Sequence, residues 1–191
     1  MKKIGFIGVG IMGKSMVRNL RKAGYEVAIY TRTKAKAEDV IAEGAVWCDT
    51  AAECAKGRDV VITIVGYPKD VEEVYFGDNG IIANADPGTY VIDMTTTSPR
   101  VAVRIWEEAE KAGLHAVDAP VTGGDTGAKA GTLTILAGGK KEDFDACVPV
   151  LRLWERILIT RERQETDSIP RCAIRLQLQV LWQEPVRQWF M

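Results

Sequence analysis

The sequence predicts an α/β domain with a doubly wound, mostly parallel sheet, and three observations carry this prediction. Short apolar runs rich in β-branched residues alternate with helical patterns through residues 1–151. Strands that are separated by whole helices pair in parallel, through right-handed crossovers. A glycine-rich turn also joins the first apolar run to the first helical pattern, which is where doubly wound folds place such a turn.

Each expected strand is an apolar run of five to seven residues, and each expected helix is a longer amphipathic stretch between two such runs. In chain order we expect strand Lys3–Ile7, helix Met12–Ala23, strand Glu26–Thr31, a helix from about Lys34, strand Asp59–Val65, helix Lys69–Tyr75, strand Tyr90–Met94, helix Pro99–Ala112, strand Leu114–Asp118, strand Thr132–Leu136 and a helix from about Lys141.

The composition excludes several classes of protein. Lys and Arg number 25 against 26 Asp and Glu, so the charge balance gives no reason to expect nucleic acid or an anionic membrane as partner. No apolar run reaches the roughly 18 residues of a membrane-spanning helix. The start, MKKIGFIGVG, is punctuated by glycines and lacks a cleavage site, so we interpret it as a strand rather than a signal peptide.

The cysteines predict neither disulfides nor a metal site. Cys48, Cys54, Cys147 and Cys172 form no CxxC pair, and the single histidine, His115, cannot complete a zinc cluster with them. We therefore expect reduced thiols buried in the core of a cytoplasmic protein. His115 lies in an expected strand, and we assign it a structural role.

Gly8, Gly10 and Gly13 make the spacing GxGxxG between the first strand and the first helix. The first glycine permits the tight turn, the second lets the backbone approach a pyrophosphate, and the third lets the helix pack on the strand. The N–H groups near Ile11 and Met12 then face the phosphates at the positive end of the helix dipole. This context predicts a Rossmann-type dinucleotide site, the alternative being a purely structural glycine turn.

The end of the second strand favours NADP (NADPH) over NAD. A carboxylate that binds the ribose hydroxyls of NAD is expected about 20 residues beyond the glycines. This sequence has Thr31, Arg32 and Thr33 there instead. Arg32 can pair with a 2′-phosphate and both threonines can donate hydrogen bonds to it. The alternative is that Arg32 is an exposed arginine without a ligand. A site for S-adenosylmethionine fits less well, because it too requires an acidic residue at the end of the second strand.

Three segments make the chain resemble the β-hydroxyacid dehydrogenases, the family of 3-hydroxyisobutyrate dehydrogenase and tartronate semialdehyde reductase. They are FIGVGIMGKSMVRNL, VIDMTTTSP and DAPVTGGDTGAKAGT, and the likeness covers residues 1 to about 151. The resemblance implies that the third segment holds the substrate carboxylate, with contacts from Val121, Thr122, Gly123 and Gly124. It also implies that Thr96, Val65 and Asp70 contact the cofactor. The alternative for the third segment is a glycine loop that serves only the fold.

The composition changes sharply at about residue 152. Residues 1–151 hold all 18 glycines and no glutamine, whereas residues 152–191 hold five glutamines, seven arginines and neither glycine nor lysine. A basic linker or a single helix over RLWERILITRERQ is the ordinary interpretation. The resemblance implies a C-terminal all-helical domain with a catalytic lysine in a GxGxxxKxxN segment, and this segment is missing from the printed tail. We therefore expect an NADP-binding domain at 1–151, an atypical tail at 152–191 and no catalytic residue.

Codon arithmetic offers an explanation for the tail. If the reading frame starts at the third base of each printed codon, permitted synonyms let Arg152-Leu153-Trp154 give Ala-Met-Gly. In the same frame Arg161 through Arg175 spell G-E-A-G-D-G-Q-H-T-K-M-C-N-Q, which contains the lysine segment. We infer that the tail is a frameshifted start of the helical domain and that its printed residues have no function of their own.

The resemblance thus implies an NADP-dependent oxidoreductase that interconverts a small hydroxy acid and a semialdehyde. The expected partner is a small-molecule carboxylate, and we expect a homo-oligomer for the full-length form. The printed chain would be inactive, so a noncatalytic NADP-binding module or an inactive fragment is the second hypothesis. An imine reductase of the same architecture is a third.

Overall fold

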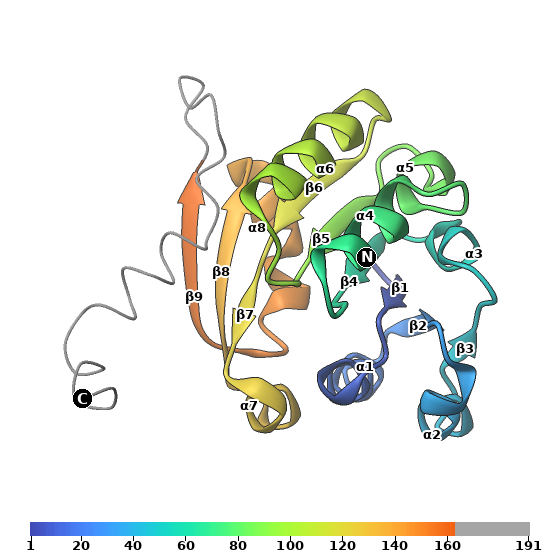
Figure 1. Ribbon diagram of the computed structural model, residues 1–191. Coiled ribbons are helices and arrows are strands. Elements are labelled where there is room, and N and C mark those ends of the chain that lie inside the picture. Colours follow the sequence, from blue (N-terminus) through green and yellow to red (C-terminus); the bar gives the residue numbers. More distant parts are fainter. Residues whose placement is uncertain (163–191) are drawn as a thin grey trace, which may run out of the picture.

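A mostly parallel sheet forms the centre of the computed structural model, which describes residues 1–162 and the side chains of residues 1–156 (Figure 1). The sheet order is β3-β2-β1-β4-β5-β6-β8-β7, and β9 pairs with β8. The strands are β1 Lys3–Ile7, β2 Glu26–Tyr30, β3 Val46–Trp47, β4 Val60–Thr63, β5 Tyr90–Asp93, β6 His115–Asp118, β7 Val121–Thr122, β8 Leu133–Gly139 and β9 Glu155–Glu162.

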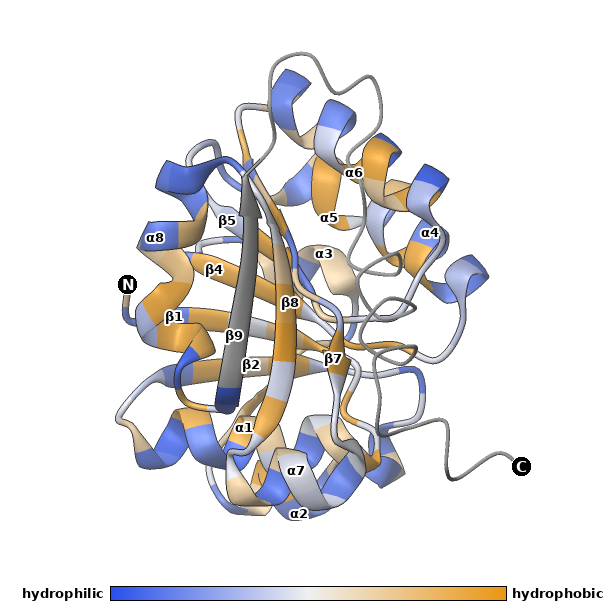
Figure 2. Ribbon diagram, turned by 90° about the vertical axis from the view of Figure 1, so that its left-hand side faces the viewer, coloured by the Kyte–Doolittle hydropathy of each residue, from blue (hydrophilic) through white to orange (hydrophobic). Residues whose placement is uncertain are grey.

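Helices cover both faces of the sheet, as in a doubly wound fold. They are α1 Ile11–Lys22, the 3₁₀ turn η1 Lys34–Lys36, α2 Glu38–Ala42, α3 Ala51–Ala55, α4 Pro68–Phe76, α5 Ile81–Asn84, α6 Pro99–Lys111, α7 Gly124–Ala130 and α8 Lys141–Leu151. One core cluster packs α1, α2, α7 and α8 against the sheet, and the other packs α3, α4, α5 and α6 against its opposite face. The central strands are therefore apolar on both faces, as Figure 2 shows by their orange colour.

The predicted fold class and its main strands and helices are confirmed, with differences where the elements are short. The helix expected from Lys34 is a 3₁₀ turn followed by the five-residue α2. The elements β3, α3, α5, β7 and α7 were not predicted, because two to seven residues are too few to show a period. Strand β8 runs antiparallel to β6 and β7, so the sheet is not parallel throughout.

The tail begins with a strand, so a single helix over residues 152–164 is wrong. Backbone pairing joins β9 to β8 in parallel, from Leu133 opposite Glu155 to Gly139 opposite Glu162. Three of the four residues at 157–160 are β-branched (Ile, Ile and Thr) and the fourth is leucine. This composition favours a strand that pairs with the open edge of β8 over a helix. The sheet therefore continues past the boundary expected near residue 151.

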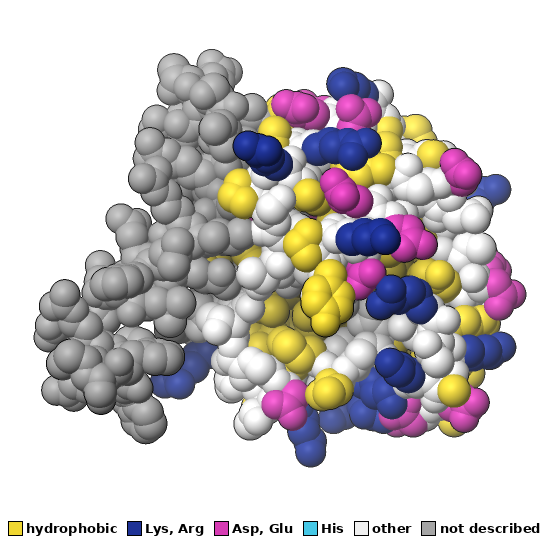
Figure 3. Space-filling model, in the orientation of Figure 1, with side chains coloured by type: hydrophobic (Ala, Val, Ile, Leu, Met, Phe, Trp, Pro, Cys, Tyr) yellow, Lys and Arg dark blue, Asp and Glu magenta, His cyan; other side chains and the backbone are white. Residues whose placement is uncertain are grey.

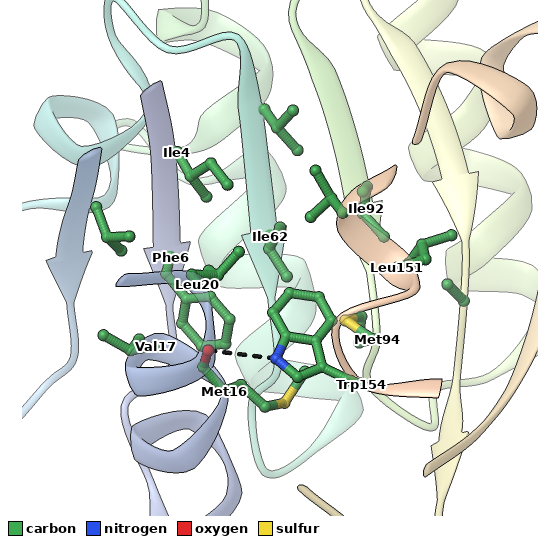
Figure 4. Close-up of a cluster of buried hydrophobic side chains, with 14 of the residues drawn as sticks. Ile4, Phe6, Met16, Val17, Leu20, Ile62, Ile92, Met94, Leu151 and Trp154 are labelled. Carbon is green, nitrogen blue, oxygen red and sulfur yellow. Dashed lines mark hydrogen bonds between the residues drawn. The ribbon is translucent and has the colours of Figure 1, made fainter. Parts of the chain in front are cut away.

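Trp154 closes the core over α1 (Figure 4). Its side chain is fully buried among Phe6, Met16 and Leu151, and its indole N–H donates to the carbonyl oxygen of Met16 at 3.3 Å. Although it lies beyond the composition change, this residue is part of the folded domain.

We expect Trp154→Ala to lower the free energy of unfolding by about 3–5 kcal/mol, because the truncation leaves a large cavity in the core. Urea denaturation followed by far-UV circular dichroism measures the change. Trp154→Phe is the matched control: it keeps most of the apolar volume, removes the N–H, and should lose much less. A loss below about 1 kcal/mol for Trp154→Ala would show that the indole is not buried as described.

Candidate functional site: a groove at the carboxyl ends of the strands

A cavity of about 840 Å³ lies at the carboxyl ends of β1, β2 and β4. The sheet order reverses between β1 and β4, and open α/β sheets bind ligands at such a switch point. Figure 3 shows hydrophobic side chains running down the middle of the face seen in Figure 1, with charged side chains beside them. The cavity brings together seven of the residues expected to bind cofactor: Gly8, Gly10, Thr31, Arg32, Thr33, Val65 and Asp70.

The glycine turn fits a pyrophosphate. Gly8 has a φ of 105°, in the left-handed region, and a Cβ built there would overlap the carbonyl oxygen of Ile64. A Cβ on Gly13 would overlap the carbonyl oxygen of Gly8, so this glycine allows α1 to pack closely. A Cβ on Gly10 would meet nothing within 4 Å. Gly8 therefore has the geometry of a tight turn, Gly10 leaves space for a close approach, and Gly13 allows close packing of the helix.

The first turn of α1 leaves backbone donors for a ligand. Gly10 precedes the helix and no side chain caps it. The first N–H groups of a helix have no intrahelical partner, and here they start beside the open space at Gly10. Ile11, Met12 and Gly13 are not among the residues that line the cavity. The contribution expected from Ile11 and Met12 is through the backbone.

Arg32 lies at the mouth of the groove and pairs with Asp70, 38 residues away. Its guanidinium donates to the two carboxylate oxygens at 2.9 and 3.3 Å. Arg32 is 69% exposed whereas Asp70 is 14% exposed, so the pair joins an exposed donor to a mostly buried acceptor. The sequence shows no carboxylate at the end of β2, but the structure brings one there from α4.

Three further charged residues line the cavity that sequence reasoning did not identify: Lys36, Glu73 and Asp78. Lys36 closes the η1 turn just after β2, on the same side as Arg32. The mouth of the groove thus carries two cations together with the acidic residues of α4 and its C-terminal loop.

A buried hydrogen-bond network underlies the loops that follow β4 and β5. Oδ1 of Asp93 accepts from the Thr63 hydroxyl at 2.8 Å and from the Thr95 N–H at 3.0 Å. The Thr95 hydroxyl in turn accepts from the N–H of Val65 at 3.0 Å. The residue expected to contact the nicotinamide, Thr96, follows directly and is exposed, although it does not line the cavity.

Burial raises the pKa of Asp93 to about 6, while its hydrogen bonds from Thr63 and Thr95 act in the opposite direction. Burial also raises the pKa of Tyr75, which contacts the Thr63 hydroxyl at 3.0 Å. Because the folded-state pKa of Asp93 is raised, its contribution to stability is largest below pH 3.8 and is lost as the pH rises through about 6. At neutral pH this carboxylate is therefore held charged against a desolvation penalty.

The expected substrate segment is built from β7 and the start of α7. Gly123 and Gly124 have φ of 127° and 62°, which favours glycine at both positions. The side chains of Val121 and Thr122 are part-exposed and exposed, and this segment does not line the cavity. Helix α7 nevertheless packs against α1, and Nδ2 of Asn19 donates to the carbonyl oxygen of Ala128 at 3.0 Å. The substrate segment and the glycine turn are therefore joined through neighbouring helices.

The remaining expectations concern residues away from the groove. His115 begins β6, contacts Asp143 at 2.8 Å and stacks on Tyr90, in agreement with a structural role. Cys48, Cys54 and Cys147 are free and buried, and Cys172 lies outside the described residues.

Residues 1–162 contain neither a membrane-spanning helix nor a cluster of metal ligands. No helix there combines the length and the apolar character needed to span a bilayer. Within the same part of the chain, no group of three or more His, Cys, Asp or Glu side chains is arranged to hold a metal ion.

Comparison with known proteins agrees with this geometry. Residues 3–159 match the family described as the NAD binding domain of 6-phosphogluconate dehydrogenase. An uncharacterized oxidoreductase of Bacillus subtilis, YkwC, is 57% identical over 152 residues, which are 80% of this chain and 53% of that protein. The chain spans about half the length of the curated relatives it matches.

Two solved structures carry the same fold. The 3-hydroxyisobutyrate dehydrogenase of Mycobacterium tuberculosis, solved with L-serine, superposes with a TM-score of 0.80 at 33% identity, over 85% of this chain and 55% of that one. Psf3 in complex with NADP+ and 2-OPP superposes with a TM-score of 0.84 at 28% identity, over 93% and 61% of the two chains.

Proposed function

Because the chain belongs to the family of the NAD binding domain of 6-phosphogluconate dehydrogenase and its relatives are 3-hydroxyisobutyrate dehydrogenase-like, we propose that it is the cofactor domain of an NADP-dependent β-hydroxyacid dehydrogenase. The reaction is hydride transfer between the nicotinamide and a small hydroxy acid or semialdehyde. The observation that carries the proposal is the groove, in which an open glycine cradle and two cations occupy the ends of β1 and β2.

The chain's own residues hold and orient the reactants. The N–H groups at Ile11 and Met12 bind the phosphates, Val65 and Thr96 line the nicotinamide side, and Val121–Gly124 hold the substrate carboxylate. A hydroxyl and two glycine N–H groups on one segment suit an anion. The cofactor supplies the hydride. The described residues contribute binding and orientation, which agrees with a domain that lacks its own proton donor.

NADP selectivity follows from Arg32 and Lys36. Both cations line the mouth of the groove near Thr31 and Thr33, where a 2′-phosphate would lie if the adenosine follows β2. Asp70 competes with the phosphate for Arg32, because a guanidinium fork satisfies one planar anion at a time. Binding of NADP therefore requires Arg32 to exchange a carboxylate for a phosphate, and this exchange sets the affinity.

We expect Arg32→Ala to weaken NADPH binding about 10- to 100-fold and NADH binding less than about threefold, since only NADPH presents the 2′-phosphate. Asp70→Asn should strengthen NADPH binding severalfold by freeing Arg32. Fluorescence titration of the 191-residue chain with both nucleotides measures the affinities. Arg104→Ala is the matched control, because Arg104 is a similarly exposed arginine on α6 outside the groove. Equal or tighter binding of NADH by the wild-type chain contradicts the proposed preference.

The proposal includes the division of the chain at about residue 152 and the frameshift that explains it. The NADP-binding domain expected at residues 1–151 extends in the structure to Trp154 and β9, and the full-length form is a cytoplasmic homo-oligomer with an all-helical second domain. The noncatalytic module is the competing function. Both functions predict that the 191-residue chain binds NADPH without turnover of short semialdehydes, so the reading frame across codons 148–175 separates them, and measurable turnover contradicts the frameshift.

A further inference from the structure

We propose that Asp93 is a positioning residue for the cofactor, acting through Thr95 to fix the two loops that border the nicotinamide side of the groove. The family to which the chain is matched does not by itself give the Asp93 side chain a role, and Asp93 is not among the residues expected to bind cofactor or substrate. Its effect on cofactor binding rests on the proposed function, whereas its effect on the loops does not.

The geometry joins both loops to one carboxylate. Asp93 ends β5, and its Oδ1 receives the Thr95 N–H from the loop that carries Thr96. The same oxygen receives the Thr63 hydroxyl from the end of β4. The Thr95 hydroxyl then receives the N–H of Val65, which lines the cavity. A single chain of hydrogen bonds therefore sets the distance between the loops after β4 and β5.

The buried state of this carboxylate points to function rather than to stability. Asp93 is 3% exposed and Thr95 4% exposed, so water does not replace these bonds. Oδ2 of Asp93 and the Thr97 hydroxyl are buried without a hydrogen-bond partner among the described residues, and both belong to the segment that ends at the nicotinamide side. An unpaired oxygen on a buried carboxylate is destabilising, and such groups concentrate at functional sites.

The groups that face Asp93 make its charge sensitive to pH. Tyr75 from α4 bonds to Thr63, and Asp118 from β6 is opposite Asp93 in the strand register. Neither neighbour carries a positive charge that would offset the burial, which raises the pKa of Asp93 to about 6. Above that pH the bond from the Thr95 N–H is charge-assisted, and such bonds are roughly twice as strong as neutral ones. The raised pKa nevertheless means that the closed network binds a proton more tightly than an opened, solvated Asp93 does, so the loops are most stable below about pH 6 and loosen as Asp93 becomes charged.

The test compares Asp93→Asn and Thr95→Val with wild type in the full 191-residue chain. Asp93→Asn keeps an oxygen acceptor but removes the charge, and Thr95→Val removes the hydroxyl that accepts from Val65 and also interacts with Asp93. The matched control is Thr89→Val, because Thr89 lies beyond the amino end of β5 and its hydroxyl donates one bond to the carbonyl oxygen of Arg58. Thr89→Val loses a comparable hydrogen bond far from the groove.

The first readout uses no cofactor. Amide hydrogen exchange by NMR at a single pH above about 6 should be at least about tenfold faster for Val65 in Thr95→Val than in wild type and Thr89→Val. It should be slower for Thr95 in Asp93→Asn than in wild type, because the penalty of the buried charge is removed. Unchanged exchange at Thr95 and Val65 in both variants overturns the proposal. Because the protein is ligand-free, this result stands whether or not the chain binds NADP.

The second readout is the affinity for NADPH and NADH from pH 5 to 8. At pH 8 we expect Asp93→Asn to bind about five- to tenfold more tightly than wild type, because its neutral amide avoids the penalty of burying a charge, and the difference to vanish at pH 5. The 2′-phosphate itself titrates at about pH 6, so the comparison is between variants with the same nucleotide. A constant ratio of affinities over this range overturns the role of the charge. If wild type binds neither nucleotide, the proposed function fails and the exchange data alone decide the role of Asp93.

Discussion

Restoring one base near codon 152 should convert the 191-residue chain, from which we expect no turnover, into an active reductase. The restored frame would supply the lysine segment that permitted synonyms of codons 161–175 can spell. A positioned general acid contributes about 10²- to 10⁴-fold to a rate. We therefore expect NADPH oxidation with a short semialdehyde to rise at least about 100-fold, because the restored chain gains both the proton donor and the second half of the active-site cleft. A spectrophotometric assay of the two purified proteins measures this ratio.

The matched control is the restored chain with that lysine replaced by methionine. It should bind NADPH as the restored chain does and lose most of the added rate, because only the proton donor is removed. Sequencing the DNA across codons 148–175 checks the premise. If the printed frame is correct there and the restored chain shows no added turnover, the inferred frameshift is wrong and the noncatalytic module becomes the leading function.

Gly10→Val should abolish cofactor binding while leaving the fold intact. A Cβ at Gly10 meets no atom within 4 Å, and Gly10 has a φ of −85°, which any residue adopts. The valine side chain would then occupy the space that a pyrophosphate needs beside the first turn of α1. We expect NADPH affinity to fall at least about 100-fold and the thermal midpoint to change little. Calorimetric titration and a thermal melt on the same sample measure both.

Gly13→Val is the matched variant, and we expect it to lower the stability of the fold, which Gly10→Val should leave nearly unchanged. Its Cβ would overlap the carbonyl oxygen of Gly8, so α1 must move away from β1 and the core contacts of Met16 loosen. We expect the free energy of unfolding to fall by about 1–3 kcal/mol through overpacking. If Gly10→Val instead unfolds the chain while Gly13→Val does not, the two glycines have been assigned the wrong roles.

The sequence by itself predicted the parts of the protein that are encoded locally. The strand–glycine–helix order at residues 3–22, the alternation of apolar runs and helices, and the cation at the end of β2 are all patterns within a few neighbouring residues. The central strands and the long helices therefore appear in the structure close to where they were expected, and the three glycines adopt the expected geometry.

Only the tertiary structure decided which distant residues meet. The pairing of Arg32 with Asp70, the tie from Asp93 to Val65 through Thr95, and the packing of α7 on α1 all join separate elements. The partner of Arg32 depends on the direction in which α4 leaves β4, and no local pattern specifies that direction. Local periodicity fixes where strands and helices form, whereas the packing of the whole sheet fixes which charges meet at its carboxyl edge.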